Sequence, residues 1–170
     1  NWVKFVYLQH ENLSVEQLQK IDTALYSQYL ILAVRVERHL LANHYLENGF
    51  SLLFAAYYFN DKKFFRLAEK VISSQLEEQI LSDGAHFELS PMYHCIILER
   101  LLDCYSIVND ERHKALSSLM LDKATPMLGW LETAVMSDGN IPLLNDSALG
   151  IAPLPAELFT YAKKLGIEWS

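Results

Sequence analysis

The sequence predicts an all-α fold of stacked helical hairpins that form part of an incomplete α/α toroid. Segments with apolar residues three or four positions apart alternate with segments that are apolar on nearly every side. In addition, Ser82-Asp83-Gly84 recurs as Ser137-Asp138-Gly139, each time between an amphipathic segment and a polar loop. A helical hairpin that repeats about every 50 residues is typical of helical toroids and solenoids. We therefore expect one partial toroid domain, residues 1–170, with half-exposed outer helices and enclosed inner ones.

The first two expected helices differ in polarity. Apolar spacing predicts an amphipathic helix over residues 14–39, and Ser14 with Gln17 forms a capping box at its start. Residues 46–59 are apolar or aromatic on almost every side, which is typical of a helix that is buried all round.

Four further helices continue this alternation. Ser90 and Pro91 mark a helix start, Gly166 marks an end, and Pro126 should kink or restart its helix near Thr125. Amphipathic helices are expected at residues 64–80 and 115–135. A helix that is apolar nearly all round is expected at 91–108, and a short last helix at 155–164.

The composition excludes several classes of protein. The 170 residues carry a formal net charge of −7 with no dense basic cluster, so nucleic acid is not an expected partner. The longest apolar run, 49–59, is about half of the roughly 20 residues that a membrane span needs. The first residues carry no targeting pattern and suggest a piece of a longer protein. Cys95 and Cys104 are too far apart along one helix to form a disulfide, so two buried thiols are expected.

Polar residues gather where the three inner helices are expected to begin, in the stretches 43–48, 86–94 and 145–147. In an up-and-down series these starts share one rim, so Asn43, His44, Tyr93 and Asn145 should converge there. Helix N-termini offer free backbone N–H groups, and this rim should therefore favour anions. Such a pocket is a candidate for acid–base chemistry.

Simpler interpretations of these residues stay open. Tyr93 can be a core tyrosine with a satisfied hydroxyl, and His44 with Glu47 can be a surface pair. His44, Glu47, His86 and His94 are possible metal ligands by type, but without tight ligand spacing no metal or other cofactor is expected. The sequence has no GxSxG motif for a serine hydrolase. A glycosidase with a carboxylate pair, drawn from Glu47, Glu88 and Asp146, is an alternative.

The stretches 43–48, 83–94 and 145–148 resemble the heparinase II/III family of polysaccharide lyases, including its alginate-lyase-like relatives, and the likeness runs from Trp2 to Gly166. The resemblance implies an incomplete α/α toroid that is followed by an antiparallel β-sandwich. We expect this chain to be the later part of the toroid, without the sandwich. The resemblance alone suggests a bacterial, periplasmic or otherwise extracytoplasmic protein.

The resemblance also implies β-elimination at uronic-acid residues of an acidic polysaccharide. Asn43 and His44 would neutralise the substrate carboxylate, which favours the enolate-like transition state at C5. Tyr93 would take the C5 proton, protonate the leaving oxygen, or do both. Residues expected to bind substrate or to orient these groups are Glu47, Glu88, His94, Asn145 and Asp146.

One position departs from the family pattern. Members commonly carry Arg where this chain has Leu89, so a mildly charged uronate polymer fits better than a heavily sulfated one. The family also draws a catalytic His from the sandwich, which we expect this chain to lack. The chain by itself should therefore fold, self-associate through exposed apolar surface and be inactive. The alternative is a non-catalytic carbohydrate-binding or structural toroid fragment.

Overall fold

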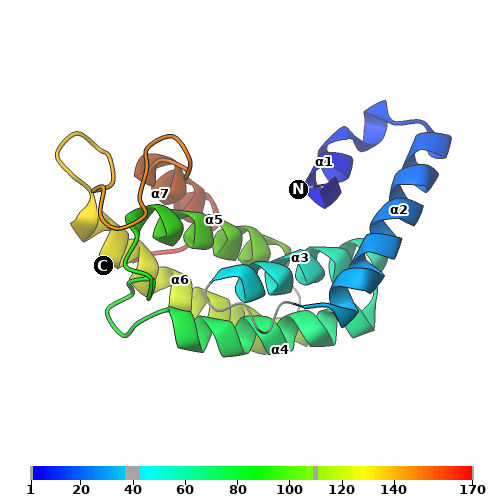
Figure 1. Ribbon diagram of the computed structural model, residues 1–170, viewed down its shortest axis with the longest axis horizontal. Helices are drawn as coiled ribbons and strands as arrows, with labels where there is room; N and C mark the ends of the chain where they lie inside the picture. The colour runs from blue at the N-terminus through cyan, green and yellow to red at the C-terminus, as the bar shows by residue number, and fades with distance from the viewer. Residues whose placement is uncertain (1, 37–42, 109–110, 170) are drawn as a thin grey trace. The chain divides into compact units, whose positions relative to one another are not determined.

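A computed structural model describes residues 2–36, 43–108 and 111–169 of the protein, which are grouped in two compact units (Figure 1). Unit 1 comprises residues 1–71 and unit 2 comprises residues 72–170. The described residues form seven α-helices and two short 3-10 helices. Helices packed against each other without a β-sheet confirm the all-α, helical-hairpin class over these residues. The toroidal arrangement of the hairpins stays a prediction.

Unit 1 contains α1 (Trp2–Gln9), α2 (Val15–Val34), α3 (Asn43–Phe59) and the first part of α4 (Lys62–Gln79). The capping box before α2 is confirmed, because Ser14 and Gln17 exchange side-chain to backbone hydrogen bonds of 2.8 and 3.2 Å. Residues 37–39 of the expected first helix lie outside the described residues. Helix α1 was not predicted, and α3 begins one turn earlier than its apolar pattern indicates.

Tyrosine hydroxyls and aromatic rings join the helices of unit 1. The Tyr58 hydroxyl on α3 donates to Asp22 on α2 at 2.6 Å, and the Tyr26 hydroxyl on α2 donates to Asp61 at 3.1 Å. The other carboxylate oxygen of Asp61 accepts the N–H groups of Lys63 and Phe64, so this residue also caps α4. Because these bonds cross from α2 to the ends of α3 and α4, they fix how the hairpin of α2 and α3 packs.

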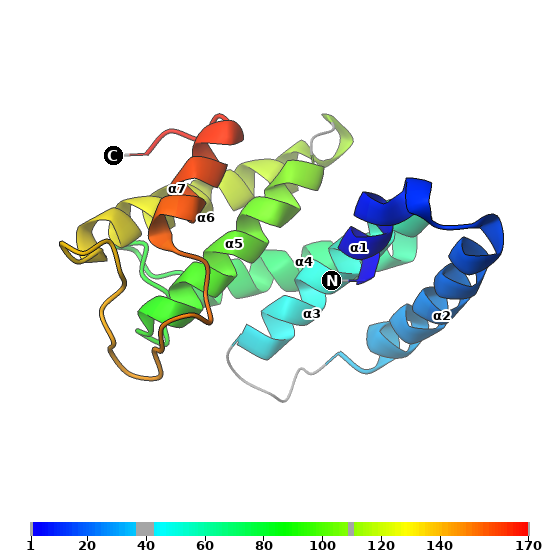
Figure 2. The ribbon, with the colours of Figure 1, turned by 90° about the horizontal axis from the view of Figure 1, so that it is seen from above.

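Unit 2 contains the rest of α4, then α5 (Pro91–Ile107), α6 (Lys114–Ala134) and α7 (Pro155–Lys164). Helices α5, α6 and α7 lie side by side in both ribbon views (Figures 1 and 2). Helix α5 is buried on most of its surface, as its apolar sequence predicts. The last helix, α7, buries only one stripe, formed by Pro155, Leu158 and Ala162 at helical spacing, so it is amphipathic and not an enclosed inner helix.

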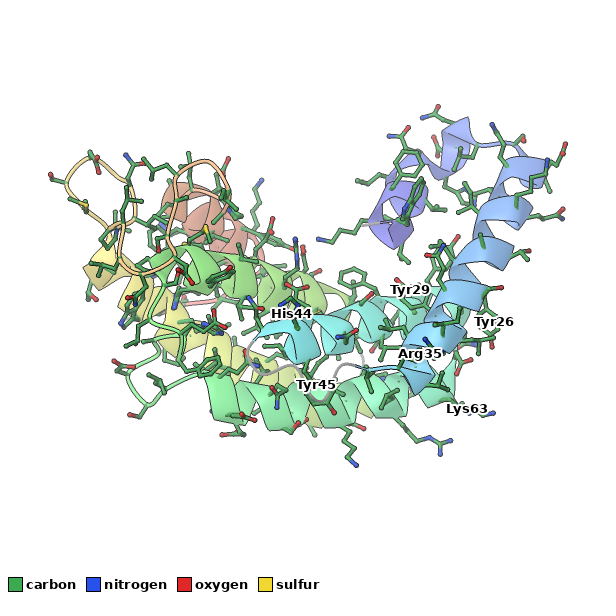
Figure 3. The ribbon with its side chains drawn as sticks, viewed as in Figure 1. Tyr26, Tyr29, Arg35, His44, Tyr45 and Lys63 are labelled. Atoms are coloured by element: carbon green, nitrogen blue, oxygen red, sulfur yellow. The ribbon has the colours of Figure 1, made fainter. Side chains whose placement is uncertain are left out.

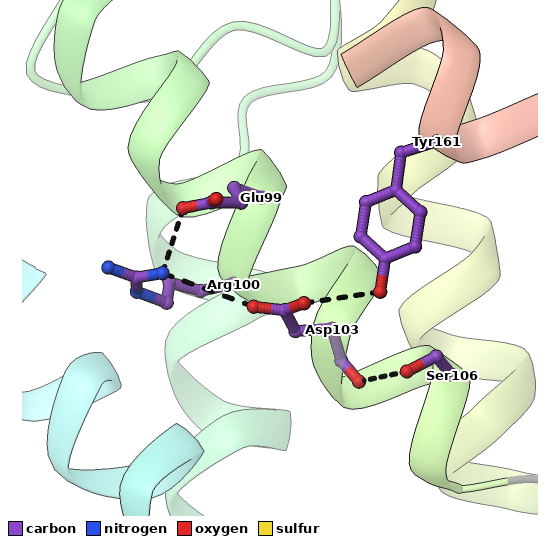
Figure 4. Close-up of polar contacts among 5 residues, drawn as sticks. All are labelled: Glu99, Arg100, Asp103, Ser106 and Tyr161. Carbon is purple, nitrogen blue, oxygen red and sulfur yellow. Dashed lines mark hydrogen bonds and ion pairs between the residues drawn. The ribbon is translucent and has the colours of Figure 1, made fainter. Parts of the chain in front are cut away.

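A polar cluster holds α7 on α5 (Figure 4). The Tyr161 hydroxyl on α7 donates to Oδ1 of Asp103 on α5 at 3.1 Å. Arg100 lies between the carboxylates of Glu99 and Asp103, at 2.8 and 3.9 Å, and Ser106 donates to the Asp103 carbonyl. The hydrogen bond between Tyr161 and Asp103 is partly buried and joins the two helices, so it favours one position of α7 along α5.

The repeated tripeptide adopts the same turn twice. In the first copy Leu81 N–H donates to Ala85 O, Gly84 N–H donates to Leu81 O, and Asp83 accepts from Ala85 N–H. In the second copy Met136 N–H donates to Asn140 O, Gly139 N–H donates to Met136 O, and Asp138 accepts from Asn140 N–H. Both glycines have positive φ, 89° and 83°. This shared hydrogen-bond pattern supports the internal repeat.

Helix α6 runs through Pro126 without the restart that was one of the two expected outcomes, and a kink at this position stays a prediction. A proline inside a helix leaves the carbonyl four residues earlier without its N–H donor. That carbonyl belongs to Asp122, an exposed residue, so water can replace the missing bond. The two cysteines are buried and form no disulfide, as predicted, and burial raises the pKa of Cys95 to about 12.

No helix within the described residues is long and apolar enough to cross a membrane. Six of the exposed large apolar side chains described in unit 2 lie in the segment that connects α6 to α7. They are Met136, Leu143, Leu144, Leu149, Ile151 and Leu154. Helix α5 is mostly buried, so self-association of unit 2 would involve this exposed segment instead. Self-association itself stays a prediction.

Candidate functional site

The candidate residues of unit 1 stand on the first turns of α3. Asn43 begins the helix, and Glu47 lies one turn further on. His44 follows Asn43 and is exposed (Figure 3). Residues four apart share a helix face, so Asn43 and Glu47 project on the same side. The side chain of Asn48 donates to the His44 carbonyl at 2.7 Å. This bond steadies the first turn, which carries Asn43 and His44.

The candidate residues of unit 2 gather where α5 begins. Ser90 is the N-cap, and its Oγ accepts the Tyr93 N–H at 3.4 Å. Ser147, from the distant loop before α7, accepts the Met92 N–H at 3.2 Å, and the two serine hydroxyls are 3.0 Å apart. Because Pro91 has no N–H, the described side chains satisfy the first turn. The expected free backbone donors are therefore not available to an anion at this helix, which corrects that prediction.

Two residues with a strained backbone conformation lie beside this helix start. Leu89 and Asn145 both have positive φ, 53° and 50°, which is uncommon for residues other than glycine. Asn145 Nδ2 donates to the Leu89 carbonyl at 2.7 Å, and the Leu89 side chain is 54% exposed. Strained backbone persists where surrounding contacts hold it, and such positions are frequent at functional sites. Asn145 thus positions Leu89, while Asp146 stays exposed next to it.

Tyr93 does not have the features of a core tyrosine with a satisfied hydroxyl. Its side chain is half-buried, and none of the described residues hydrogen bonds to its hydroxyl. Glu88, five residues earlier, is also half-buried and does have an interaction partner. A buried or half-buried tyrosine hydroxyl usually finds a partner, so an open one is available to a ligand.

His94 is buried in the core of unit 2 at 1% exposure. Its Nε2 lies 3.0 Å from the carbonyl of Met127 on α6, and its ring packs on Trp130. A carbonyl only accepts, so Nε2 carries the proton. Because His94 is buried, the structure does not support direct contact with a substrate. An orienting role for His94 beside Tyr93 stays a prediction.

A chain of side chains fixes the tautomer of the second buried histidine, His86. Gln75 donates to the Glu78 carboxylate at 2.8 Å and accepts from Gln79 at 2.8 Å. The amide oxygen of Gln79 lies 3.2 Å from His86 Nε2. An amide oxygen only accepts, so His86 Nε2 must be the donor. The Nδ1 atoms of His86 and His94 are consequently bare acceptors, and both are buried without a partner.

Burial lowers the pKa of both histidines, His86 and His94, to about 4. For His94, the hydrogen bond to Met127 and the charge of Asp83 offset part of this effect, while His86 adds to it. Between about pH 6.5 and 4 the unfolded chain binds protons that the folded chain does not. Stability conferred by the neutral rings is thus present above about pH 6.5 and is lost as the pH falls.

We expect unit 2 to be destabilised at pH 5 relative to pH 7.5 by about 2 kcal/mol for each of these two histidines. Chemical denaturation at both pH values measures the loss. His86→Gln or His94→Gln should reduce the loss of stability between pH 7.5 and pH 5 by about half, although each substitution lowers stability at neutral pH. His10→Gln, at an exposed histidine of unit 1, should leave it unchanged. Equal pH dependence in all four proteins would contradict the assignment.

The contact between Ser147 and α5 gives a further expected result. Ser147→Ala removes the acceptor of the Met92 N–H and should lower the free energy of unfolding by about 1 kcal/mol. Ser137→Ala is the matched control, because Ser137 is exposed and has no described side-chain hydrogen bond. Thermal denaturation of both variants measures the difference, and equal melting temperatures would show that the loop does not cap α5.

The two groups of candidate residues belong to different units. Asn43, His44 and Glu47 are in unit 1, whereas Glu88, Tyr93, His94, Asn145 and Asp146 are in unit 2. Within unit 2 the structure brings the 145–147 loop to the start of α5. Convergence of the two groups on one rim stays a prediction. Among the described residues, no group of three or more His, Cys, Asp or Glu side chains is arranged to hold a metal ion.

The contact of Ser147 with α5 and the polar chain behind His86 were not predicted, because the partners are distant in sequence or lie across a turn. A signal was present for Ser147, which follows the candidates Asn145 and Asp146 directly. For the chain behind His86, Gln75 and Gln79 sit four apart on the otherwise apolar face of α4. Polar residues on a buried face require partners, and this requirement can be recognised in a sequence.

The structure is an all-α scaffold of helical hairpins. It carries a half-buried tyrosine with an open hydroxyl at a serine-capped helix start, and this is a candidate acid–base site. A family model described as Heparinase II/III N-terminus matches residues 15–163. The chain therefore belongs to the heparinase II/III family, as its motifs indicate. No curated protein and no solved structure matches the chain.

Proposed function

We propose that this chain is part of a polysaccharide lyase that cleaves a uronic-acid-containing polysaccharide by β-elimination. Membership of the heparinase II/III family, over residues 15–163, is the observation that carries this proposal. The family suggests polysaccharide lyase activity in the full-length protein. The particular substrate and the roles of individual residues belong to the proposal.

In this mechanism Tyr93 exchanges protons with the substrate. The C5 proton of a uronate is weakly acidic because the neighbouring carboxylate is already negative. Asn43 and His44 donate hydrogen bonds to that carboxylate and stabilise the charge that develops on it when the proton leaves. Tyr93 then removes the C5 proton or protonates the oxygen that leaves C4, and a C4–C5 double bond forms. The open hydroxyl of Tyr93 supports this role.

The other candidates shape the site. Asn145 holds Leu89 in its strained conformation, and the Leu89 side chain presents an apolar surface where the family commonly carries Arg. This difference favours a mildly charged uronate polymer over a heavily sulfated one. Glu47, Glu88, His94 and Asp146 orient the reacting groups or contact the sugar. A non-catalytic carbohydrate-binding role is the second candidate, favoured if residues outside this chain are missing from the natural protein.

The test is elimination by the full-length protein. Alginate, hyaluronan, heparan sulfate and bacterial capsule are incubated with it, and the ultraviolet absorbance of the conjugated uronate product is followed. We expect one of the less sulfated polymers to give product. The 170-residue chain by itself should give none, since removing part of a catalytic unit abolishes most of its effect. Hydrolytic products with reducing ends but no double bond would favour the glycosidase alternative.

A further inference from the structure

A groove in unit 1 carries a cation that the proposed mechanism does not use. It has a volume of about 350 Å³ and lies between α2 and α3, where it is lined by Gln28, Ile31, Leu32, Arg35 and Asn48. Ligand pockets of proteins begin at about 300 Å³, so this groove accommodates a small group such as one sugar residue. Its lining combines two aliphatic side chains with three side chains that hydrogen bond.

Among the described residues of this lining, Arg35 carries the charge. It stands at the C-terminal end of α2, where its backbone N–H is bonded to the carbonyls of Ile31 and Leu32 (Figure 3). Its side chain is exposed, and no described residue gives it a hydrogen bond or an ion pair. A guanidinium presents a fork of N–H donors that matches the two oxygens of a carboxylate.

The charge of the chain makes this arrangement informative. Acidic residues outnumber basic ones, 21 to 14, yet the described residues that line the groove include a cation, Arg35, and no acidic side chain. Gln28 and Asn48 add neutral donors and acceptors that suit sugar hydroxyls, and the aliphatic pair Ile31 and Leu32 suits the apolar face of a pyranose ring. Complementarity therefore favours an anionic sugar over a neutral one or a cation.

The groove also adjoins the candidate residues of α3. Asn48 lines the groove and donates to the His44 carbonyl at 2.7 Å, so the lining continues directly into the turn that carries Asn43 and His44. We propose that the groove is a subsite that binds a uronate residue of the acidic polysaccharide, with Arg35 on the carboxylate. This subsite rests on the proposed function for the identity of the polymer, but its chemistry concerns binding and not proton transfer.

Binding of a mannuronate tetrasaccharide, measured by isothermal titration calorimetry, tests the subsite, with cellotetraose as the neutral probe. We expect the wild-type protein to bind the acidic probe in preference to the neutral one. Arg35→Gln should raise the Kd for the acidic probe about fivefold to tenfold, and Arg35→Lys should raise it less. Added salt should weaken wild-type binding more than it weakens binding by Arg35→Gln.

Arg66→Gln is the matched control. Arg66 is an exposed arginine of α4 in the same unit, it does not line the groove, and its substitution removes the same charge. Equal Kd values for the Arg35→Gln and Arg66→Gln proteins would overturn the subsite, as would equal binding of both probes or no binding of the acidic one.

The same variants separate this inference from the proposed function. A full-length protein that forms unsaturated product with the same KM in wild type and Arg35→Gln overturns the subsite and leaves the lyase intact. A full-length protein that binds the acidic probe through Arg35 but forms no product supports the subsite and contradicts the lyase.

Discussion

Tyr93→Phe in the full-length protein should lower kcat for elimination by about a thousandfold or more, because it deletes the group proposed to carry the proton. The substitution keeps the aromatic ring, which is half-buried at the start of α5. No described hydrogen bond to the hydroxyl is lost, so stability should change by less than about 0.5 kcal/mol. Substrate binding should also persist, so the loss should fall on kcat and not on KM.

The matched control is Tyr105→Phe. Tyr105 lies on the same helix, is also half-buried and has no described hydrogen bond to its hydroxyl. Ultraviolet absorbance of the unsaturated product gives the rates, and a denaturation curve for each variant shows that the fold is retained. If both variants turn over substrate like wild type, Tyr93 is a structural tyrosine and the proposed mechanism is wrong.

The helices were predictable because their information is local. Apolar spacing set the ranges of α4, α5 and α6 to within two residues, and the Ser14 capping box is a four-residue signal that the structure contains. Helix α1 was missed because it is mostly apolar at its start and lacks a polar face that would reveal the helical period. The run of α6 through Pro126 was not predictable, since it depends on Asp122 being exposed.

The candidate site was predictable in composition but only partly in geometry. The motifs selected Tyr93 and Asn145, and the structure places the loop of Asn145 against the start of the helix that carries Tyr93. The closing of that helix start by Ser147 depends on a contact between segments far apart in the chain, which periodicity does not encode. Arg35 was overlooked for a similar reason, because a groove between two helices exists only after they pack.

The repeated tripeptide yields the second large effect, since its two glycines share a conformation but not an environment. A Cβ at Gly84 would overlap the carbonyl group of Pro126 on α6 and would lie 3.1 Å from the Met127 nitrogen. A Cβ at Gly139 would meet nothing within 4 Å. The two sites therefore separate the cost of a positive φ from the cost of close packing.

Gly139→Ala should lower the free energy of unfolding by about 1–2 kcal/mol, which is the cost of a left-handed backbone for a residue with a Cβ. Gly84→Ala bears a similar backbone cost, and in addition its turn must move away from the backbone of α6. Overpacking against backbone adds about 1–3 kcal/mol, so the total loss should be about 2–5 kcal/mol. Urea denaturation of the protein, followed by tryptophan fluorescence, measures both variants.

The comparison also tests the position of the turn that leads to the candidate site. The turn of Gly84 precedes His86 and Leu89, so its displacement from α6 should also disturb the buried hydrogen bond between His94 and Met127. We therefore expect Gly84→Ala, but not Gly139→Ala, to weaken the acid sensitivity that His94 confers, because partial exposure of a ring restores its ordinary pKa. Equal stability and equal pH dependence in the two variants would mean that the turn does not pack on α6 as described.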